Sequence, residues 1–279
     1  MSVQAGGGAL TAVARLKALS ALVPGMGRLK RQRDALIAEQ TEFVRKVFAR
    51  VKRQARQECV ALGERFLEPH ALEDGGLEEQ LAAIRKVVSP IQGWVSDDSG
   101  ALLYSAVRGM ESSSNVVELG AWKGRSTVWL ASGIRDRGEG RVYVVDTWRG
   151  TRSNPLELNL LRGYGCDELF DEFLVNLQRA GVTHFVEPIR DTTGHAAKRW
   201  PKERKIGLLF IDAEHAYQAV REDFDTWSPF VSPGGYVVLD DVPGWYGPTK
   251  LALDVVFEEN FRIVGASENQ LLLRKTQDS

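Results

Sequence analysis

The first part of the chain has the hydrophobic spacing of helices. Between residues 29 and 67, apolar side chains recur every three or four positions among basic ones, which predicts one long amphipathic helix. The same spacing predicts helices over 77–88 and 99–110, and Asp97 or Asp98 can cap the second of these. The first 110 residues are therefore expected to be helical, and the apolar stripe of the long helix must be buried against another surface.

From residue 115 onward, short apolar runs alternate with amphipathic stretches. Strands are predicted over 115–119, 141–146, 183–188, 207–212, 235–240, 261–265 and 270–274. Helices are predicted over 124–134, 167–180, 193–200, 215–230 and 248–258. Apolar strands that alternate with helices are typical of a parallel sheet covered on both faces, so this part is expected to be an α/β domain.

Composition narrows the class of protein. With 279 residues, 43% of them hydrophobic and 26% charged, the chain has the composition of a globular protein. It lacks the run of about 18 apolar residues that a membrane-spanning helix needs. Its two cysteines, Cys59 and Cys166, are too few for a disulfide framework or a zinc cluster. Arg15 and Lys17 interrupt the apolar residues near the start, so no signal peptide is predicted and a cytoplasmic location is expected.

Charge is distributed unevenly along the chain. Residues 1–57 carry 12 basic and 3 acidic side chains, a net charge of +9, which leaves −10 for the rest because the total is −1. A basic arm can bind nucleic acid or a membrane surface, or it can be a solvated helix face that docks on an acidic subunit. The second alternative is favoured, since exposed aromatic residues are not interleaved with the basic ones. We therefore expect a homo-oligomer formed through the N-terminal helices, and no nucleic acid partner.

A glycine-bearing turn follows the first predicted strand. Gly120 and Gly124 lie within the sequence Glu118-Leu119-Gly120-Ala121-Trp122-Lys123-Gly124, where the strand gives way to a helix. Glycine lets the backbone approach a ligand, and the N-terminus of the helix offers free N–H groups. The spacing differs from the G-x-G-x-x-G of nicotinamide sites and from a phosphate-binding loop. A tight turn without a ligand is the alternative.

Acidic residues stand at the ends of the following strands. Asp146 ends the second strand, where a carboxylate can bind ribose hydroxyls, and Asp191 follows the third. Trp148 could stack on an adenine or cover the edge of the sheet. Since the ends of parallel strands meet at one edge, these residues are expected to face one ligand site.

The fourth and fifth strands bring three more carboxylates to this edge. Asp212 ends the fourth strand, and Asp240 and Asp241 end the fifth. Converging carboxylates suit Mg²⁺, although Asp240 and Asp241 could instead end a strand and cap a turn. Neighbouring strand residues point to opposite faces, so both can bind one metal only if the backbone turns there, as residues 242–244 (Val-Pro-Gly) make plausible.

Residues 115–275 resemble a class I S-adenosylmethionine-dependent methyltransferase. The resemblance rests on the E-x-G-x-x-x-G loop, the acidic strand ends and the order of the elements. It implies a Rossmann-like, seven-stranded, mostly parallel sheet with helices on both faces and a reversed last strand. The chain then divides into a flexible or short helical segment (1–28), a helical region for oligomerisation or as a lid (29–110) and the methyltransferase domain (111–279).

The resemblance also implies roles for individual residues. The glycine loop would hold the methionine end of S-adenosylmethionine, Asp146 its ribose, and Asp191 would lie beside the adenine. The residues expected to bind this cofactor are Glu118, Gly120, Ala121, Gly124, Ser126, Asp146, Thr147, Trp148, Asp191, Thr192 and Asp212.

The pair of motifs Asp212-x-x-His215 and Asp240-Asp241 narrows the subclass. It resembles the metal-dependent O-methyltransferases, particularly the macrolide-sugar enzymes and the wider family with cephalosporin-hydroxylase-like members. Catechol O-methyltransferase is a more distant likeness, because it uses a lysine base where this chain has His215. The resemblance implies Asp212, Asp240 and Asp241 as Mg²⁺ ligands and His215 as the catalytic base; a histidine that only bonds the backbone of its helix is the alternative.

We therefore expect an S-adenosylmethionine- and Mg²⁺-dependent O-methyltransferase of natural product biosynthesis. Its small-molecule acceptor would be a hydroxyl of a sugar or glycosylated natural product, with Trp245 and Tyr246 in the acceptor pocket. The alternatives are a catechol or polyphenol O-methyltransferase, a hydroxylase-like family member that does not transfer methyl, and a non-catalytic assembly protein with a basic helical arm.

Overall fold

The computed structural model describes residues 26–68, 75–111, 115–150, 159–161, 164–165, 167–257 and 260–276. The chain has two compact units, Met1–Ala49 and Arg50–Ser279. Residues 1–25 of the expected segment 1–28 lie outside the described residues, and residues 26–28 belong to the first described helix. None of the described helices combines the length and the apolar composition that crossing a membrane requires.

The long N-terminal helix is shorter at its end than the spacing predicts. Helix α2 covers Met26–Ala61 and crosses the boundary between the two units. The prediction of a helix up to residue 67 is wrong for its last turns, because the chain turns back at residues 62–63 and Glu64 N–H donates to the carbonyl of Cys59. Leu67 then forms a parallel bridge with Gly265. Pairing with a strand that lies 198 positions away in sequence is not visible in a helical pattern.

Two further helices precede the sheet. Helix α3 covers Gly75–Val88 and α4 covers Asp97–Arg108, close to the predicted ranges. The N-cap of α4 is Ser96 rather than Asp97 or Asp98, since its hydroxyl accepts a hydrogen bond from Ser99 N–H at 3.1 Å. The two aspartates lie in the first turn, where the helix dipole stabilises negative charge.

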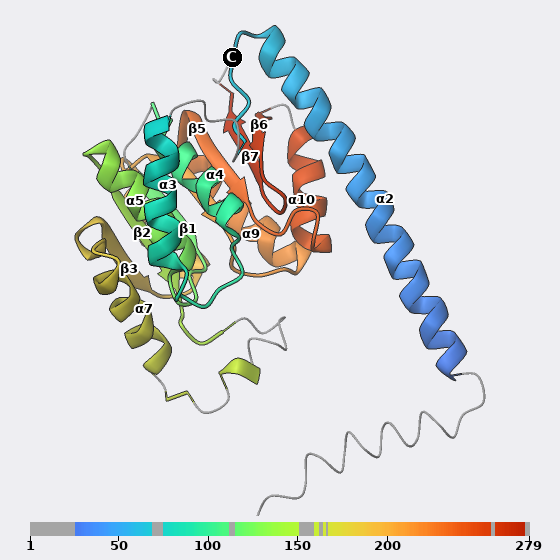
Figure 1. Ribbon diagram of the computed structural model, residues 1–279, viewed down its shortest axis with the longest axis horizontal. Coiled ribbons are helices and arrows are strands. Elements are labelled where there is room, and N and C mark those ends of the chain that lie inside the picture. Colours follow the sequence, from blue (N-terminus) through green and yellow to red (C-terminus); the bar gives the residue numbers. More distant parts are fainter. Residues whose placement is uncertain are drawn as a thin grey trace, which may run out of the picture. The chain divides into compact units, whose positions relative to one another are not determined.

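The sheet contains the seven strands that the sequence predicts, in the predicted order along the chain. Its seven strands are β1 (Asn115–Leu119), β2 (Arg141–Asp146), β3 (Val186–Arg190), β4 (Ile206–Ile211), β5 (Val231–Leu239), β6 (Phe261–Ala266) and β7 (Leu271–Lys275). They lie in the order β3-β2-β1-β4-β5-β7-β6, and β7 is antiparallel to both neighbours while the other pairs are parallel. The prediction of six parallel strands and a reversed seventh is confirmed (Figure 1).

Two strands begin three or four residues away from the predicted position, and the other strand boundaries lie within two residues of the prediction. Residues Thr183–Phe185 form the 3₁₀ turn η1, so β3 begins later than predicted, and β5 begins at Val231, four residues earlier than predicted. A second 3₁₀ turn, η2 (Ser228–Phe230), leads into β5. Hydrogen bonding to a neighbouring strand decides these ends, and local hydrophobicity does not report it.

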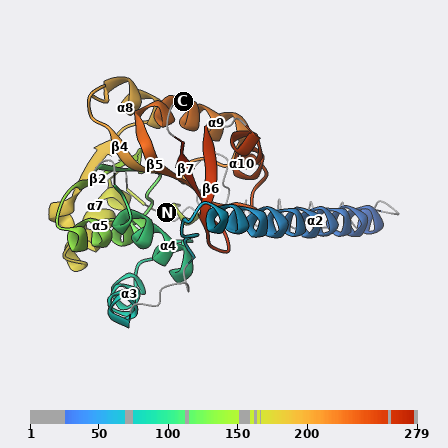
Figure 2. The same ribbon diagram turned by 90° about the horizontal axis from the view of Figure 1, so that it is seen from above.

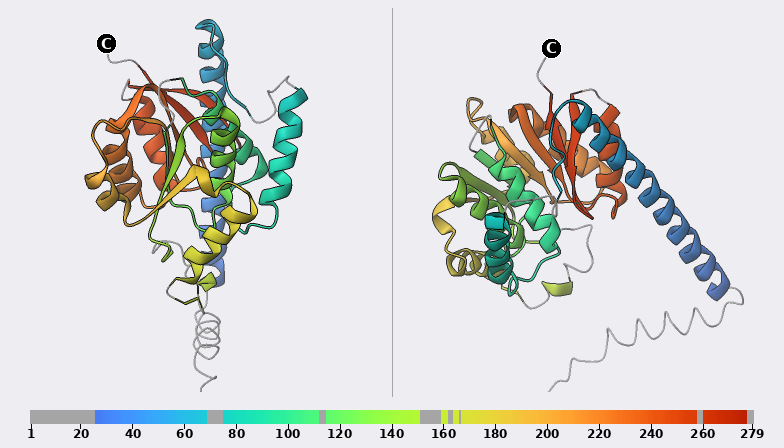
Figure 3. Two further views of the ribbon diagram at one scale, coloured as in Figure 1. Left: turned by 90° about the vertical axis from the view of Figure 1, so that its left-hand side faces the viewer. Right: turned by 45° about the horizontal axis from the view of Figure 1, so that its top comes forward.

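Helices cover both faces of the sheet. These helices are α5 (Arg125–Arg137), α7 (Glu168–Arg179), α8 (Thr193–Arg199), α9 (Tyr217–Trp227) and α10 (Tyr246–Phe257). Figure 2 shows α8, α9 and α10 on one side and α4, α5 and α7 on the other, and Figure 3 shows the same two layers from further directions. Central strand β4 is buried at every residue because both faces are covered. The carboxyl ends of β1, β2, β3, β4 and β5 consequently meet at one edge.

Candidate active site

A cavity of about 1440 Å³ lies at the carboxyl ends of the parallel strands. The loops after β1 to β5 line it, together with residues 92–95 between α3 and α4. Ligand sites of single small molecules usually enclose about 300–1,000 Å³, so this cavity has room for two molecules side by side. It is the place where open α/β sheets bind their ligands.

The two glycines of the first loop have different roles. Both adopt a left-handed backbone, with φ of 84° at Gly120 and 86° at Gly124. A Cβ at Gly120 would collide with the carbonyl group of Asp212, so glycine lets the loop approach the end of β4 inside the cavity. A Cβ at Gly124 would come within 3.0 Å of the Phe173 ring on α7. Gly124 therefore packs against a helix and does not line the cavity, and Gly120 and Ala121 do.

Glu118 lies beneath the loop and not on the cavity wall. Its side chain is fully buried, and its two oxygens accept hydrogen bonds from the hydroxyls of Ser126 (2.5 Å) and Thr127 (2.6 Å). Burial raises the pKa of Glu118 to about 8, although the two hydroxyls act to lower it. Glu118 and Ser126 thus hold the start of α5 against β1, and of the two only Ser126 also lines the cavity.

Asp146 connects the first two loops. One oxygen accepts from the N–H groups of Ala121 (2.8 Å) and Trp122 (3.1 Å), and the other accepts from Trp148 N–H at 2.6 Å. Burial raises the pKa of the Asp146 carboxyl, and these backbone N–H groups oppose the rise. The N–H of Thr147 also bonds to this carboxylate, so backbone groups take up most of its lone pairs. Asp146 and Thr147 both line the cavity.

Trp148 cannot take the adenine-stacking role that the sequence suggested. Its side chain is 2% exposed and contacts the rings of Phe170 and Phe173 at centroid distances of 4.6 and 4.8 Å. Its indole N–H donates to the carbonyl of Trp122 at 3.0 Å. The left-handed backbone of Trp148, with φ of 50°, turns this ring under the glycine loop toward α7. The proposed stacking is therefore corrected to a packing role.

Asp191 and Thr192 line another part of the cavity, after β3. The Asp191 carboxylate accepts from Thr192 N–H at 2.8 Å and from Arg199 at 2.5 Å. Thr192 caps α8, because its hydroxyl oxygen accepts from His195 N–H. These contacts hold both residues in place at the cavity.

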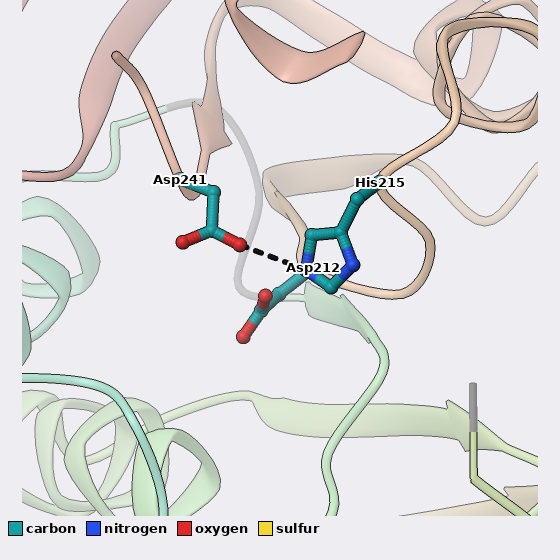
Figure 4. Close-up of side chains that lie close together, drawn as sticks. All are labelled: Asp212, His215 and Asp241. Atoms are coloured by element: carbon teal, nitrogen blue, oxygen red, sulfur yellow. Dashed lines mark ion pairs between the residues drawn. The ribbon is translucent and has the colours of Figure 1, made fainter. Parts of the chain in front are cut away.

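Asp212, His215 and Asp241 come together at the ends of β4 and β5 (Figure 4). Each offers one ligand atom, and these atoms lie within 4.8 Å of one another. The Nε2 of His215 is 2.8 Å from an Asp241 oxygen. Asp241 has a left-handed backbone with φ of 59°, so the turn between Asp240 and Asp241 that the sequence required is present.

Asp240 lies deeper than its neighbour. It is 8% exposed and is hydrogen bonded to Asp212, and it is not in the group of three converging ligand atoms. Burial raises the pKa of Asp212 and of Asp240. The charges of Asp240 and Asp241 raise the pKa of Asp212 further; Asp241 also raises that of Asp240, which the hydrogen bond with Asp212 acts to lower. Crowded, desolvated carboxylates of this kind fit a divalent cation, which would remove the repulsion between them. The structure thus joins His215 to two of the three predicted metal ligands and sets the third behind them.

Comparison with known proteins agrees with this geometry. Residues 117–242 match the family model described as a methyltransferase domain. Residues 117–242, fewer than half of the 279 residues, therefore resemble a methyltransferase domain. The expected resemblance to the class I methyltransferases is thereby confirmed for the part of the chain that holds the cavity loops.

Two curated relatives each match part of this chain. One is an uncharacterized protein, R132, of Acanthamoeba polyphaga mimivirus, 35% identical over 66 residues, 24% of this chain and 26% of that protein. The other is the 8-demethyl-8-(2,3-dimethoxy-alpha-L-rhamnosyl)-tetracenomycin-C 4'-O-methyltransferase of Streptomyces olivaceus, 23% identical over 139 residues, 46% of this chain and 52% of that protein. The chain thus spans about a quarter and about half of the lengths of these relatives.

Solved structures share the fold. The cofactor-bound structure of Rv0187 from MTB is 18% identical, with a TM-score of 0.50, and the match covers 75% of this chain and 94% of that one. This likeness extends beyond the 117–242 match and supports the seven-stranded architecture of the methyltransferase domain.

The sequence analysis missed the place of two residues that line the cavity. Trp245, predicted only as part of an acceptor pocket, stacks on the His215 ring at a centroid distance of 4.3 Å and an angle of 22°. Asp223, on α9, also lines the cavity, although it is only 6% exposed. Burial raises the pKa of Asp223 to about 6. An acidic residue among the buried positions of an amphipathic helix was the available signal for Asp223.

Proposed function

We propose that the protein is an S-adenosylmethionine-dependent O-methyltransferase that uses a divalent cation to methylate a sugar or glycoside hydroxyl. The observation that carries the proposal is that Asp212, His215 and Asp241 share one cavity with the glycine loop, which touches the end of β4 at Gly120. A methyl donor on the loop and an acceptor on the acidic cluster would then be neighbours. The relative whose name gives a rhamnosyl 4'-O-methyltransferase favours a sugar hydroxyl.

The cofactor would lie along the first three loops. Gly120 and Ala121 offer a close backbone approach for its methionine end, and Asp191 and Thr192 border the place of its adenine. Asp146 lines the cavity between these residues, and its carboxylate would accept a hydrogen bond from a ribose hydroxyl. Glu118, Gly124 and Trp148 would support these contacts from behind the wall.

The acidic cluster would hold the acceptor. A divalent cation bound by Asp212 and Asp241, with Asp240 adding negative charge behind them, would lower the pKa of an acceptor hydroxyl. Mg²⁺ prefers oxygen ligands, which leaves the His215 imidazole to receive the hydroxyl proton. S-adenosylmethionine, when bound, would supply the methyl group to the hydroxyl oxygen and leave as a neutral thioether that keeps the electron pair of the carbon–sulfur bond. Trp245 keeps the His215 ring in place by stacking on it.

Titration with S-adenosylhomocysteine and Mg²⁺, followed by turnover assays in EDTA, tests this function. We expect binding of S-adenosylhomocysteine, loss of turnover in EDTA and recovery when Mg²⁺ is added in excess. A panel of glycosides and catechols would identify the acceptor, and turnover of catechols alone would refute the sugar assignment. Full activity in EDTA would refute the metal assignment. Glu187→Gln, at an exposed acid on β3, is the matched control and should leave activity unchanged.

We also propose that the N-terminal helices join copies of the chain. Phe43 of α2 is 68% exposed, and an apolar side chain of this size on a basic helix favours burial in an oligomer. Light scattering on the full chain should give a larger mass for the wild type than for Phe43→Glu. Equal monomer masses for both would refute this role.

A further inference from the structure

The segment between α3 and α4 lies outside the 117–242 match but forms part of the cavity wall. Gln92, Gly93, Trp94 and Val95 all line the cavity. Trp94 is 52% exposed and contacts the Trp122 ring of the glycine loop at a centroid distance of 5.4 Å. The Trp122 indole N–H donates to the side-chain oxygen of Gln92 at 2.5 Å. The segment is thus connected directly to the glycine loop.

One side chain holds this segment together. Arg125, the first residue of α5, donates from Nε to the carbonyl of Val95 (2.8 Å) and from Nη1 to the carbonyls of Val88 (3.0 Å) and Ile91 (3.1 Å). Its Nη2 donates to the Asp97 carboxylate at 2.7 Å. Four of the five N–H donors of a guanidinium are therefore used on the end of α3, the connecting segment and the start of α4.

The chemistry of these contacts requires arginine. The side chain of Arg125 is 17% exposed, so the carbonyls of Ile91 and Val95 would lose this donor in a place with little access to water, whereas that of Val88 keeps the N–H of Ile91. Lysine carries its three donors on one nitrogen and cannot reach acceptors spread along ten residues. The segment also packs closely on the arginine stem, because a Cβ at Gly93 would lie 3.1 Å from the Arg125 Cβ.

We infer that Arg125 is a positioning residue that makes residues 88–97 a wall of the cofactor site. It follows Gly124 directly, so the start of α5, the glycine loop and the segment are held in one arrangement. Loss of the guanidinium would release Trp94 and Gln92 from Trp122 and loosen the loop that receives the cofactor. The inference rests on the proposed placement of S-adenosylmethionine along this loop.

Binding of S-adenosylhomocysteine, measured by calorimetry, tests the inference without an acceptor or a metal. We expect Arg125→Ala to raise the Kd at least tenfold, and Arg125→Lys to restore only part of the affinity. The matched control is Arg137→Ala, since Arg137 lies on the same helix, is 16% exposed and donates to the carbonyl of Met110 away from the cavity. Arg137→Ala should lower Tm but leave the Kd within twofold of the wild-type value. A threefold or smaller effect of Arg125→Ala, or an equal effect of Arg137→Ala, would overturn the inference.

Hydrogen exchange on the wild type provides a second test that needs no variant. S-adenosylhomocysteine should slow amide exchange in peptides covering 88–97, and unchanged exchange there despite binding would overturn the inference alone. A wild-type protein that does not bind S-adenosylhomocysteine would refute the proposed function, and this inference with it.

Discussion

The two ends of the cavity differ in how far the protein satisfies its own polar groups. At the glycine loop, Glu118 and Asp146 accept hydrogen bonds from hydroxyls and backbone N–H groups on both oxygens. At the ends of β4 and β5, Asp212, Asp240 and Asp241 lie together, and their mutual repulsion adds to the effect of burial on the pKa of Asp212. The first end is preorganised by the chain itself, whereas the crowded carboxylates of the second are where the proposed cation would bind.

The strongest way to break this comparison is to remove the base or a carboxylate from the second end. His215→Ala should lower kcat by about 10²–10⁴-fold, the range for a lost general base, with little change in affinity for S-adenosylhomocysteine. Asp241→Asn should also lower turnover, and excess Mg²⁺ should recover part of that loss.

The double variant tests whether the action of His215 depends on a hydroxyl held by the acidic cluster. The effects of His215→Ala and Asp241→Asn should not add, because a base has little to act on when the hydroxyl is not held. Steady-state kinetics on the two single variants and the double variant would measure this. Full activity of His215→Ala would show that another group acts as the base, and the proposed role of the carboxylates would stand.

The preorganised end should respond in binding rather than in turnover at saturation. Asp146→Ala leaves the backbone N–H groups of the first two loops without their acceptor, so affinity for S-adenosylhomocysteine should fall by about 1.5–3 kcal/mol. Calorimetry would measure the loss, and Asp225→Ala, at an exposed acid on α9, is the control. Unchanged affinity would mean that neither the loop nor the ribose depends on Asp146.

Asp223 lines the same cavity as Asp212, and burial is the largest cause of the raised pKa of both carboxyls. A carboxyl whose pKa rises from 3.8 to about 6 on folding binds its proton more tightly in the folded state. The free energy of unfolding therefore falls as pH rises through this window, and the full penalty applies above pH 6. Asp223→Asn should raise stability by roughly 1–3 kcal/mol at pH 8 and by less at pH 5. Urea unfolding at both pH values would test this, and an equal effect at both would exclude the titration of Asp223 as its cause.

Much of the fold was predictable because its signals are local. Short apolar runs marked the seven strands, and an acidic residue at or directly after the ends of four of them marked the edge that carries the cavity. The sequence suggested a close backbone approach at both Gly120 and Gly124, and the structure has it inside the cavity at Gly120. The left-handed turn at Asp241 could be expected from the residues that follow it.

The sequence alone determined the order of the elements, the edge of the sheet that carries the chemistry and the acidic residues gathered there, because alternation and turn residues act over a few positions. The tertiary structure decided which side chains reach the cavity. Trp148 packs against α7 and Glu118 bonds to the hydroxyls of Ser126 and Thr127, so neither lines the cavity. Arg125 reaches carbonyls 30 to 37 positions earlier in the chain. Such contacts depend on how separate elements pack against one another, and the spacing of residues along a single element does not encode that packing.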